Sequence, residues 1–300
     1  MTTTITQQIT TPQPEETPQK EDIQFIVRGY SWRPFLGFTL PHLDFLTPQG
    51  LGSAPLFGEH TLTLTKEKYC LECQNPTITD TQYCKECQKL VKIQRLECIT
   101  KGAGTPYNQK CSPENPPCNS PWAAKHCGEE HVVYIAGFGE LFKVGVTKAE
   151  RWNTPDGYKY RLIEQGADSA AVLRGNLNLA SAQETEQLIA DALDLETRVP
   201  FEYKAEEFAN PKEPQIQELR KLSQEAARRF KLHEVCILDL SQVYGVRPPL
   251  TVDINLWQIE DLLGKVAYVR GNILYLQSNG LLIAHDLSSA RGKGVICEED

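Results

Sequence analysis

"HVVYIAGFGELFKVGVT" (residues 131–147) decides the fold, because its two apolar runs flank a short glycine turn at residues 137–139. Apolar runs on both sides of such a turn predict an antiparallel β-hairpin. The first run carries Tyr134, and the second carries Lys143, a charged residue in an otherwise apolar run. If both side chains point to the same face of the hairpin, they lie close together. We therefore predict that this hairpin forms part of a functional site.

The segments after the hairpin predict a ββαβα unit over residues 132–195. Its first two strands are residues 132–136 and 142–147. "KYRLIEQGAD" predicts a short helix that ends at Gly166, because glycine commonly terminates helices. "SAAVLR" (residues 169–174) predicts a third strand, and a second helix follows it.

The second helix carries a carboxylate on its apolar side. Ser181-Ala-Gln-Glu184 matches a capping box, which predicts that the helix begins at Ser181 and assigns Glu184 to the cap. Glu186 follows Ala182 by four residues and precedes Ile189 by three, so it lies on the apolar stripe. A carboxylate there is costly unless it is paired or bound to a metal. Glu186 is therefore the candidate metal ligand, and a buried ion pair without chemistry is the alternative.

Four cysteines upstream have the spacing of a metal site: Cys70-x2-Cys73, ten residues, then Cys84-x2-Cys87. Each Cys-x2-Cys places two thiolates on one side of a tight turn, and two such turns form the tetrahedron that Zn²⁺ accepts. A redox pair is the alternative, although a single Cys-x2-Cys would suffice for it. Four protein ligands leave no position for water, so the predicted zinc is structural.

A second group of cysteines follows in a segment rich in Pro, Gly and Asn. It consists of Cys98, Cys111, Cys118 and Cys127, separated by twelve, six and eight residues. A segment with so little apolar content needs a cross-link to become ordered. The hypothesis is a second zinc, and the alternative is free cysteines on a loop.

Composition and termini indicate a cytoplasmic protein. No run of about 18 apolar residues occurs, so no membrane span is expected. "MTTTITQQITTPQPEETPQKED" lacks the basic and apolar regions of a secretory signal, and residues 1–21 are expected to be disordered. Ten cysteines without an export signal favour metal ligands in a reducing compartment over disulfides.

The charge distribution limits the possible partners. The net charge is −8, but residues 60–175 hold 15 Lys/Arg and 13 Asp/Glu, a balance of +2. Any contact with phosphate must therefore be local, and the acidic remainder of the surface suits a protein partner.

These patterns together predict an α+β protein of several segments. The predicted segments are a disordered tail (1–21), an N-terminal β segment (22–65), a zinc ribbon (66–95), a Cys-rich loop (96–131), the ββαβα core (132–195), a helical connection (196–235) and a C-terminal β subdomain (236–300).

The core resembles the GIY-YIG nucleases. "VVY", then "KVG" nine residues later, then "RLIEQG" and a helix with a glutamate follow the order of the family's motifs. Tyr134 matches the first tyrosine, with Val132 in place of the preceding glycine. Lys143 replaces the second tyrosine, and Gly145 matches the glycine after it.

Two arginines compete for the family's helix arginine. Arg151 has nearly the usual distance from Gly145, whereas Arg161 has the better helical context, and we favour Arg161. Gln165 stands where the family often has a histidine.

A wider resemblance covers roughly residues 60–300. A four-cysteine ribbon, a cysteine-bearing loop, the hairpin, "RLIEQGA" and a terminal "GKVAYVRGNILYLQSNG" look like the bacterial and archaeal family called domain of unknown function 2797. That resemblance implies a fold and a site, but no established activity.

The nuclease resemblance implies a catalytic site and a nucleic-acid partner. Glu186 would hold Mg²⁺, Arg161 would brace the phosphate, and Tyr134 would orient or deprotonate water. Lys143 would lower the pKa of that tyrosine. The same residues also suit the binding of DNA or RNA without hydrolysis. The second class of function is a zinc-stabilised protein-interaction module, with Glu186 merely paired with Arg161 or Lys143.

Overall fold

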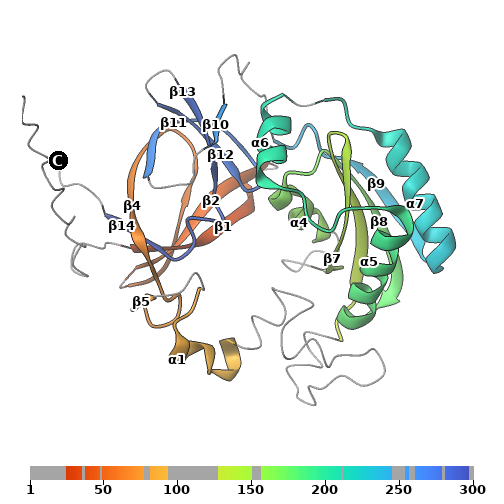
Figure 1. The fold of residues 1–300 in the computed structure, drawn as a ribbon, viewed down its shortest axis with the longest axis horizontal. Coiled ribbons are helices and arrows are strands. Elements are labelled where there is room, and N and C mark those ends of the chain that lie inside the picture. Colours follow the sequence, from red (N-terminus) through yellow and green to blue (C-terminus); the bar gives the residue numbers. More distant parts are fainter. Residues whose placement is uncertain are drawn as a thin grey trace, which may run out of the picture.

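The computed structural model describes residues 25–35, 38–47, 49–77, 82–93, 128–150, 157–210, 212–244, 254–256, 261–278 and 281–296. They form a mixed α+β protein with two mainly antiparallel β-sheets (Figure 1). No helix in these ranges is long and apolar enough to cross a bilayer.

The smaller sheet contains the predicted hairpin. Its strands lie in the order β7 (Leu141–Lys148), β6 (His131–Phe138), β8 (Ser169–Leu177) and β9 (His233–Asp239). The hairpin is confirmed, because β6 pairs antiparallel with β7 along its whole length. Between the strands lie α4 (Tyr158–Gln165), α5 (Leu179–Leu193), α6 (Phe201–Ala209) and α7 (Ile216–Phe230).

The termini of two helices test the predicted caps. Gly166 ends α4 with a φ of +81°, a left-handed conformation that glycine adopts without strain, so the predicted stop is confirmed. The predicted capping box at Ser181 is wrong, because α5 begins at Leu179. Its N-cap is Asn178, whose side chain accepts a hydrogen bond from the Ser181 N–H at 2.9 Å. Asparagine is as good an N-cap as serine, and this one comes earlier in the chain.

The two faces of the small sheet are covered by different elements. Val133 and Ile135 point into an aliphatic cluster that α5 and α7 complete. Tyr134 and Phe138 point to the other face, where α4, α6 and the larger sheet pack against them. Figure 1 accordingly shows α4 and α6 between the two sheets, and α5 and α7 on the far side of the small sheet.

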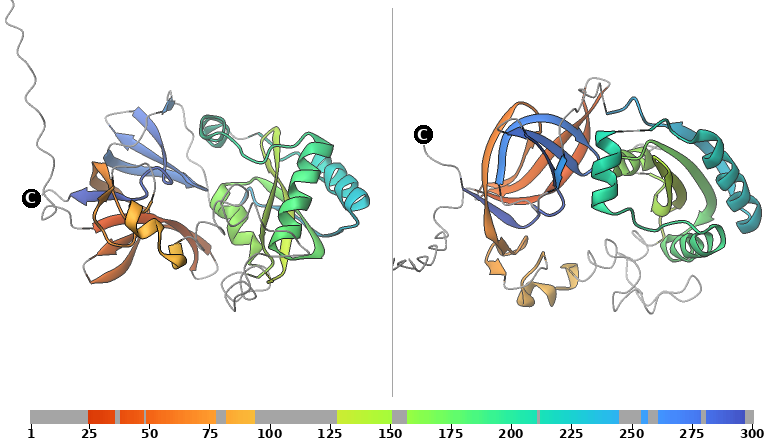
Figure 2. Two further views of the ribbon diagram at one scale, coloured as in Figure 1. Left: turned by 60° about the horizontal axis from the view of Figure 1, so that its bottom comes forward. Right: turned by 45° about the horizontal axis from the view of Figure 1, so that its top comes forward.

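The larger sheet joins strands from both ends of the described chain. Its strands are β1 (Phe25–Phe35), β2 (Phe38–Thr47), β3 (Gly50–Pro55), β4 (Glu59–Tyr69), β5 (Pro76–Thr77), β10 (Ile254–Leu256), β11 (Asp261–Arg270), β12 (Ile273–Ser278), β13 (Leu281–Asp286) and β14 (Lys293–Ile296). Their order is β10-β13-β12-β11-β4-β14-β1-β2-β3, with β5 beside β4. The strands curve around a common interior (Figure 2).

This sheet differs from the division expected from the sequence, which separated an N-terminal β segment (22–65) from a C-terminal one (236–300). β14 lies between β1 and β4, and β11 pairs with β4, so both segments share one sheet. β9 belongs instead to the small sheet. Local patterns identify strands, but they do not carry the pairing of strands far apart in the chain.

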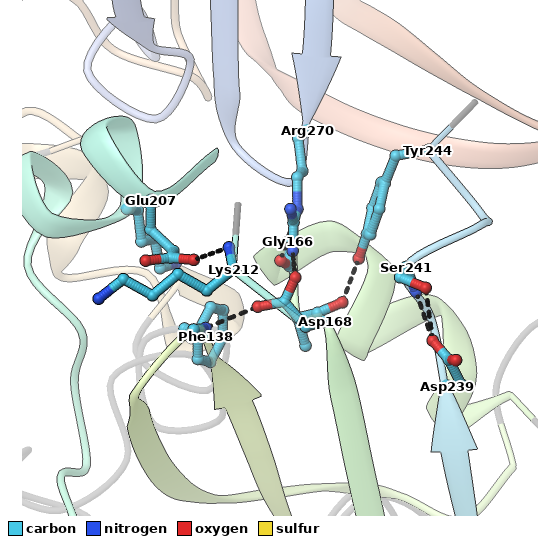
Figure 3. A network of polar contacts seen from close by, with 12 residues as sticks. Phe138, Gly166, Asp168, Glu207, Lys212, Asp239, Ser241, Tyr244 and Arg270 are labelled. Carbon is cyan, nitrogen blue, oxygen red and sulfur yellow. Dashed lines mark hydrogen bonds and ion pairs between the residues drawn. The ribbon is translucent and has the colours of Figure 1, made fainter. Parts of the chain in front are cut away.

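A buried ion pair joins the two sheets. The Arg270 guanidinium pairs with Asp168 and also donates from Nε to the Gly166 carbonyl oxygen at 3.0 Å (Figure 3). The other oxygen of Asp168 accepts from the Gly139 N–H at 2.7 Å, so the carboxylate is well satisfied. The Arg270 guanidinium also lies 4.2 Å from the centre of the Phe208 ring. Both charged side chains are almost fully buried, so each depends on the other.

Candidate functional site

The first four cysteines converge at one end of the larger sheet. Cys70 directly follows β4, Cys73 lies in the next turn, and Cys84 and Cys87 belong to the short helix α1 (Lys85–Gln88) and its N-cap. Their four sulfur atoms all lie within 4.8 Å of one another, and the cluster can hold a metal ion. Figure 1 places α1 and β5 below β4, away from the small sheet.

The distances between these sulfur atoms are compatible with zinc. The Cys73 and Cys84 Sγ atoms are 3.7 Å apart, and all four thiols are free. A tetrahedron of Zn–S bonds of about 2.3 Å separates sulfur atoms by about 3.8 Å, whereas a disulfide requires about 2.05 Å. The site is closed by four protein ligands, which fits a structural ion rather than a catalytic one.

The surroundings of Cys70 lower the pKa of its thiol, which favours the thiolate form that binds metal. Burial raises the pKa of the Cys70 thiol, but hydrogen bonds from the backbone N–H groups of Cys73, Cys84 and Glu72 outweigh it and lower the pKa to about 7. Burial raises the pKa of Cys87. Since the thiolate is the ligand form, zinc would have to displace a proton from Cys87 more than from Cys70.

Several sequence-based candidates lie outside the described residues. These are Cys98, Cys111, Cys118, Cys127 and Arg151. The second zinc therefore stays a prediction.

Tyr134 lies buried at the centre of the small sheet. It pairs with Gly145 of β7, and its ring lies directly over that glycine. A Cβ added at Gly145 would come within 2.3 Å of the Tyr134 ring and hydroxyl, which explains why this strand position needs glycine. The hydroxyl accepts a hydrogen bond from Gln165 Nε2 at 2.7 Å. Gln165, the last residue of α4, thus holds the hydroxyl oxygen of Tyr134.

Lys143 and Arg161 lie on the same side of the sheet as Tyr134. Lys143 pairs with Ala136, two residues from Tyr134 on the same face of β6. Arg161 forms an ion pair with the buried Glu164 at 3.6 Å, and its own side chain is 46% exposed. Burial works against the Arg161 cation, but the neighbouring Tyr134 and Glu164 outweigh it and raise its pKa.

Two further cations, Lys204 and Arg198, complete a group that sequence reasoning missed. Lys204 on α6 is buried, and its Nζ donates to the Gln165 carbonyl oxygen at 3.1 Å. Burial lowers the pKa of Lys204 to about 8. Lys143, Arg161 and Arg198 also act to lower it, and Asp286 acts in the opposite direction. We call Lys143, Arg161, Arg198 and Lys204 the cationic cluster.

A signal for Lys204 was present in the sequence. Lys204 follows Phe201 by three residues and precedes Phe208 by four, so it lies on the apolar stripe of α6. The same argument singled out Glu186. A cation on an apolar stripe is as informative as a carboxylate there.

The family assignment follows from residues 58–289, which match the family described as "Protein of unknown function (DUF2797)". The chain belongs to this family. No curated protein and no solved structure matches it significantly. The DUF2797 region includes the four cysteines, Tyr134 and the whole cationic cluster, whereas β1, β2 and β3 lie outside it.

Within the DUF2797 region, Glu186 is separated from Tyr134 by the sheet. It shares a helix stripe with Ala182 and Ile189, which are buried in the aliphatic cluster on the opposite face. Burial raises the pKa of Glu186, and Lys143 acts in the other direction. Lys143 lies on β7, the end strand of the small sheet, and its charge acts on Glu186.

This placement does not fit a Mg²⁺ ion shared by Glu186 and Tyr134. Tyr134, Lys143 and Arg161 lie on one side of the sheet, and Glu186 lies on the other. In the described ranges, the only cluster of three or more possible metal ligands is the four cysteines. The helical stripe was identified from periodicity, but periodicity does not say which face of a sheet the helix covers.

Proposed function

We propose that this protein is a zinc-stabilised nucleic-acid-binding protein that holds phosphate groups at the cationic cluster. The observation that supports it is that Lys143, Arg161 and Arg198 all act on the buried ammonium of Lys204, with Asp286 as an opposing charge. Cations held together repel one another, and a bound anion relieves that repulsion. In a chain with net charge −8, such a local group is where phosphate would be attracted.

The resemblance to the GIY-YIG nucleases supports phosphodiester as the ligand. The elements β6, β7, α4, β8 and α5 follow the expected order strand, strand, helix, strand, helix. Tyr134, Lys143 and Arg161 are the residues that match the family's motifs, and they lie on one face of the sheet. We take this face as the phosphate-binding surface of a divergent, nuclease-like core.

The geometry favours binding over cleavage. Tyr134 is almost fully buried and its hydroxyl oxygen already accepts a hydrogen bond from Gln165, so the side chain is poorly placed to act on a water molecule. Glu186 lies with α5 on the other face, where it serves no reaction at Tyr134. A metal-dependent phosphodiesterase is therefore the weaker proposal.

Salt-dependent binding tests this function. Binding of labelled single-stranded and duplex DNA and RNA is measured by fluorescence anisotropy over a range of salt concentrations. Phosphate contacts release counterions, so the logarithm of affinity should fall linearly with the logarithm of salt concentration. Lys143→Ala should weaken binding and reduce the slope by about 0.7 to 0.9 for the one lost contact.

The matched control is Lys221→Ala. Lys221 is an exposed lysine on α7, 73% accessible and paired with Glu218, on the far face of the small sheet. It should leave both affinity and slope unchanged. Binding that ignores salt, or that Lys143→Ala leaves intact, contradicts the proposal and favours a protein-interaction module.

A further inference from the structure

A second pair of arginines consists of Arg28 on β1 and Arg291 in the turn before β14. The turn that carries Arg291 is fixed on both sides, since the Gly292 N–H donates to the Val27 carbonyl oxygen at 2.7 Å. The Gly292 carbonyl oxygen accepts from the Tyr69 N–H at 2.6 Å. Val27 immediately precedes Arg28 in β1, and Tyr69 immediately precedes Cys70. The turn therefore lies against β1 and close to the four cysteines, and the charge of Arg28 acts on Arg291.

The half-buried Arg291 side chain carries one nitrogen without a partner. Its Nε is buried and has no hydrogen-bond acceptor. Burial lowers the pKa of Arg291, and Arg28 lowers it further, while Tyr83 and Tyr30 oppose them. In the described part of the chain, no carboxylate acts on this guanidinium. Buried cations are normally paired, so this one is suited to an anion from outside the chain.

Tyr30 connects this pair to the cationic cluster. Its hydroxyl donates to the Glu164 carbonyl oxygen on α4 at 3.2 Å, and Glu164 is the carboxylate that pairs with Arg161. Tyr30 also acts electrostatically on both Arg291 and Arg161. Two cationic sites that share one tyrosine are neighbours, so they suit phosphates a few nucleotides apart on one strand.

We propose that Arg28 and Arg291 form a second phosphate-binding site, and that a single strand of nucleic acid runs from it past Tyr30 to the cationic cluster. This inference rests on the proposed function and extends it to a strand of several nucleotides. A flexible single strand follows such a path more readily than a stiff duplex, and tyrosine between phosphate sites suits contact with a base or a sugar.

The test compares strand lengths on the full chain. The probes are labelled oligothymidylates, one of about 12 nucleotides, within the range that single-strand sites cover, and one dinucleotide. The double variant with Arg28→Gln and Arg291→Gln should bind the long strand more weakly. Its salt slope should fall by about 1.4, which is about 0.7 for each lost contact. Binding of the dinucleotide at the cationic cluster should not change.

Two further variants serve as controls for misfolding and for the loss of surface charge. Arg28→Gln alone changes an exposed residue, so it tests the site without risk to the fold, and its slope should fall by about 0.7. Arg228→Gln on α7 changes an arginine that is 72% exposed and paired with Glu225, and it should have no effect.

The outcomes separate this inference from the proposed function. Wild-type affinity and slope in both Arg28 variants would refute the second site and leave the first intact. Failure of wild type to bind any strand in a salt-dependent way would refute the proposed function and the second site with it. Polyglutamate serves as an acidic-peptide competitor at equal charge concentration. If it displaced the long strand from wild type but not from the double variant, the Arg28–Arg291 pair would be a protein-docking site and our assignment would be wrong.

Discussion

The two faces of the four-stranded sheet differ in what they bury. One face is covered by α5 and α7 with aliphatic contacts such as Val133, Ile189 and Leu219. The other face buries Asp168 against Arg270, and Lys204 beside the Tyr134–Gln165 hydrogen bond. Aliphatic packing asks only for volume, but a buried charge requires a specific partner. The first face therefore stabilises the sheet by packing alone. The second face depends on defined pairs of charged and polar side chains.

The largest effect that we predict concerns the four-cysteine cluster, which lies at one end of the larger sheet, away from both faces of the small sheet. Cys70→Ser with Cys73→Ser should remove stoichiometric zinc, measured by mass spectrometry of the purified protein. It should also abolish hydrogen-exchange protection around α1. Structural zinc contributes about 10–16 kcal/mol of binding free energy in zinc-finger peptides, so its loss should unfold this local segment.

The small sheet provides the control for that experiment. Cys236→Ser alters a cysteine of β9 whose sulfur lies 3.6 Å from the Tyr158 hydroxyl, against the core between the two sheets, and should leave zinc content unchanged. Zinc that persists in the double variant would show that these cysteines do not hold it.

The buried Arg270–Asp168 ion pair should contribute most to the stability of the second face. Asp168→Ala leaves Arg270 buried without its partner, which should cost about 3–5 kcal/mol of unfolding free energy. Urea denaturation measures this loss. A cost below about 1 kcal/mol, the value of an exposed pair, would mean that water reaches the guanidinium.

The aliphatic face should lose stability without losing function. Ile189→Ala removes a fully buried side chain and should cost about 2–5 kcal/mol. Its affinity for oligonucleotides and its salt slope should match those of wild type. A changed salt slope of oligonucleotide binding in this variant would contradict the conclusion that the aliphatic face takes no part in binding.

Lys204 should make phosphate binding depend on pH. The groups that face it are Lys143, Arg161, Arg198 and Asp286, and its pKa is lowered to about 8. Below that pH the ammonium is charged, so affinity for phosphate should fall as the pH rises through about 8. The unfolded chain holds this proton up to a higher pH, so stability should rise over the same interval.

Substitution at Lys204 isolates this effect. Lys204→Arg keeps the charge and should remove the pH dependence between pH 7 and about 9, because arginine stays protonated. Lys204→Met should bind weakly and equally at both pH values. An unchanged pH profile in both variants would assign the titration to another group.

The smallest effect is expected at Tyr134. Tyr134→Phe removes the acceptor of the Gln165 hydrogen bond and should cost about 1 kcal/mol of stability, with little change in affinity. Neither wild type nor variant should cut DNA or RNA with Mg²⁺ or Mn²⁺. Mg²⁺-dependent cleavage by wild type that Tyr134→Phe abolishes would reverse our preference and establish a nuclease.

The sequence predicted the features that neighbouring residues determine. The hairpin, the stop at Gly166 and the grouping of Cys70 with its three partners depend on short spacings. The periodicity of α5 correctly marked Ala182 and Ile189 as buried. Each of these depends on a turn or a helix of a few residues, for which local preference decides the conformation.

The remainder depends on contacts between distant segments. The sequence placed Glu186 on the correct stripe of its helix. Which face of the sheet α5 covers depends instead on the direction that the chain takes after β8. Lys204 becomes informative only when α6 packs between the sheets, next to Gln165. The strand order β4-β14-β1 joins residues more than two hundred positions apart, and no local pattern encodes it.

That strand order has a consequence for folding during translation. Phe25 pairs with Val295, so β1 and β4 cannot be joined until β14 has been translated. The small sheet and the cysteine centre have all their residues available earlier, and domains fold as their chains emerge. During that interval β1 and β4 each present an unpaired edge, which is the kind of surface that chaperones protect and that aggregation exploits. β14, the last of the described strands to be made, is thus the one that joins β1 to β4 in the larger sheet.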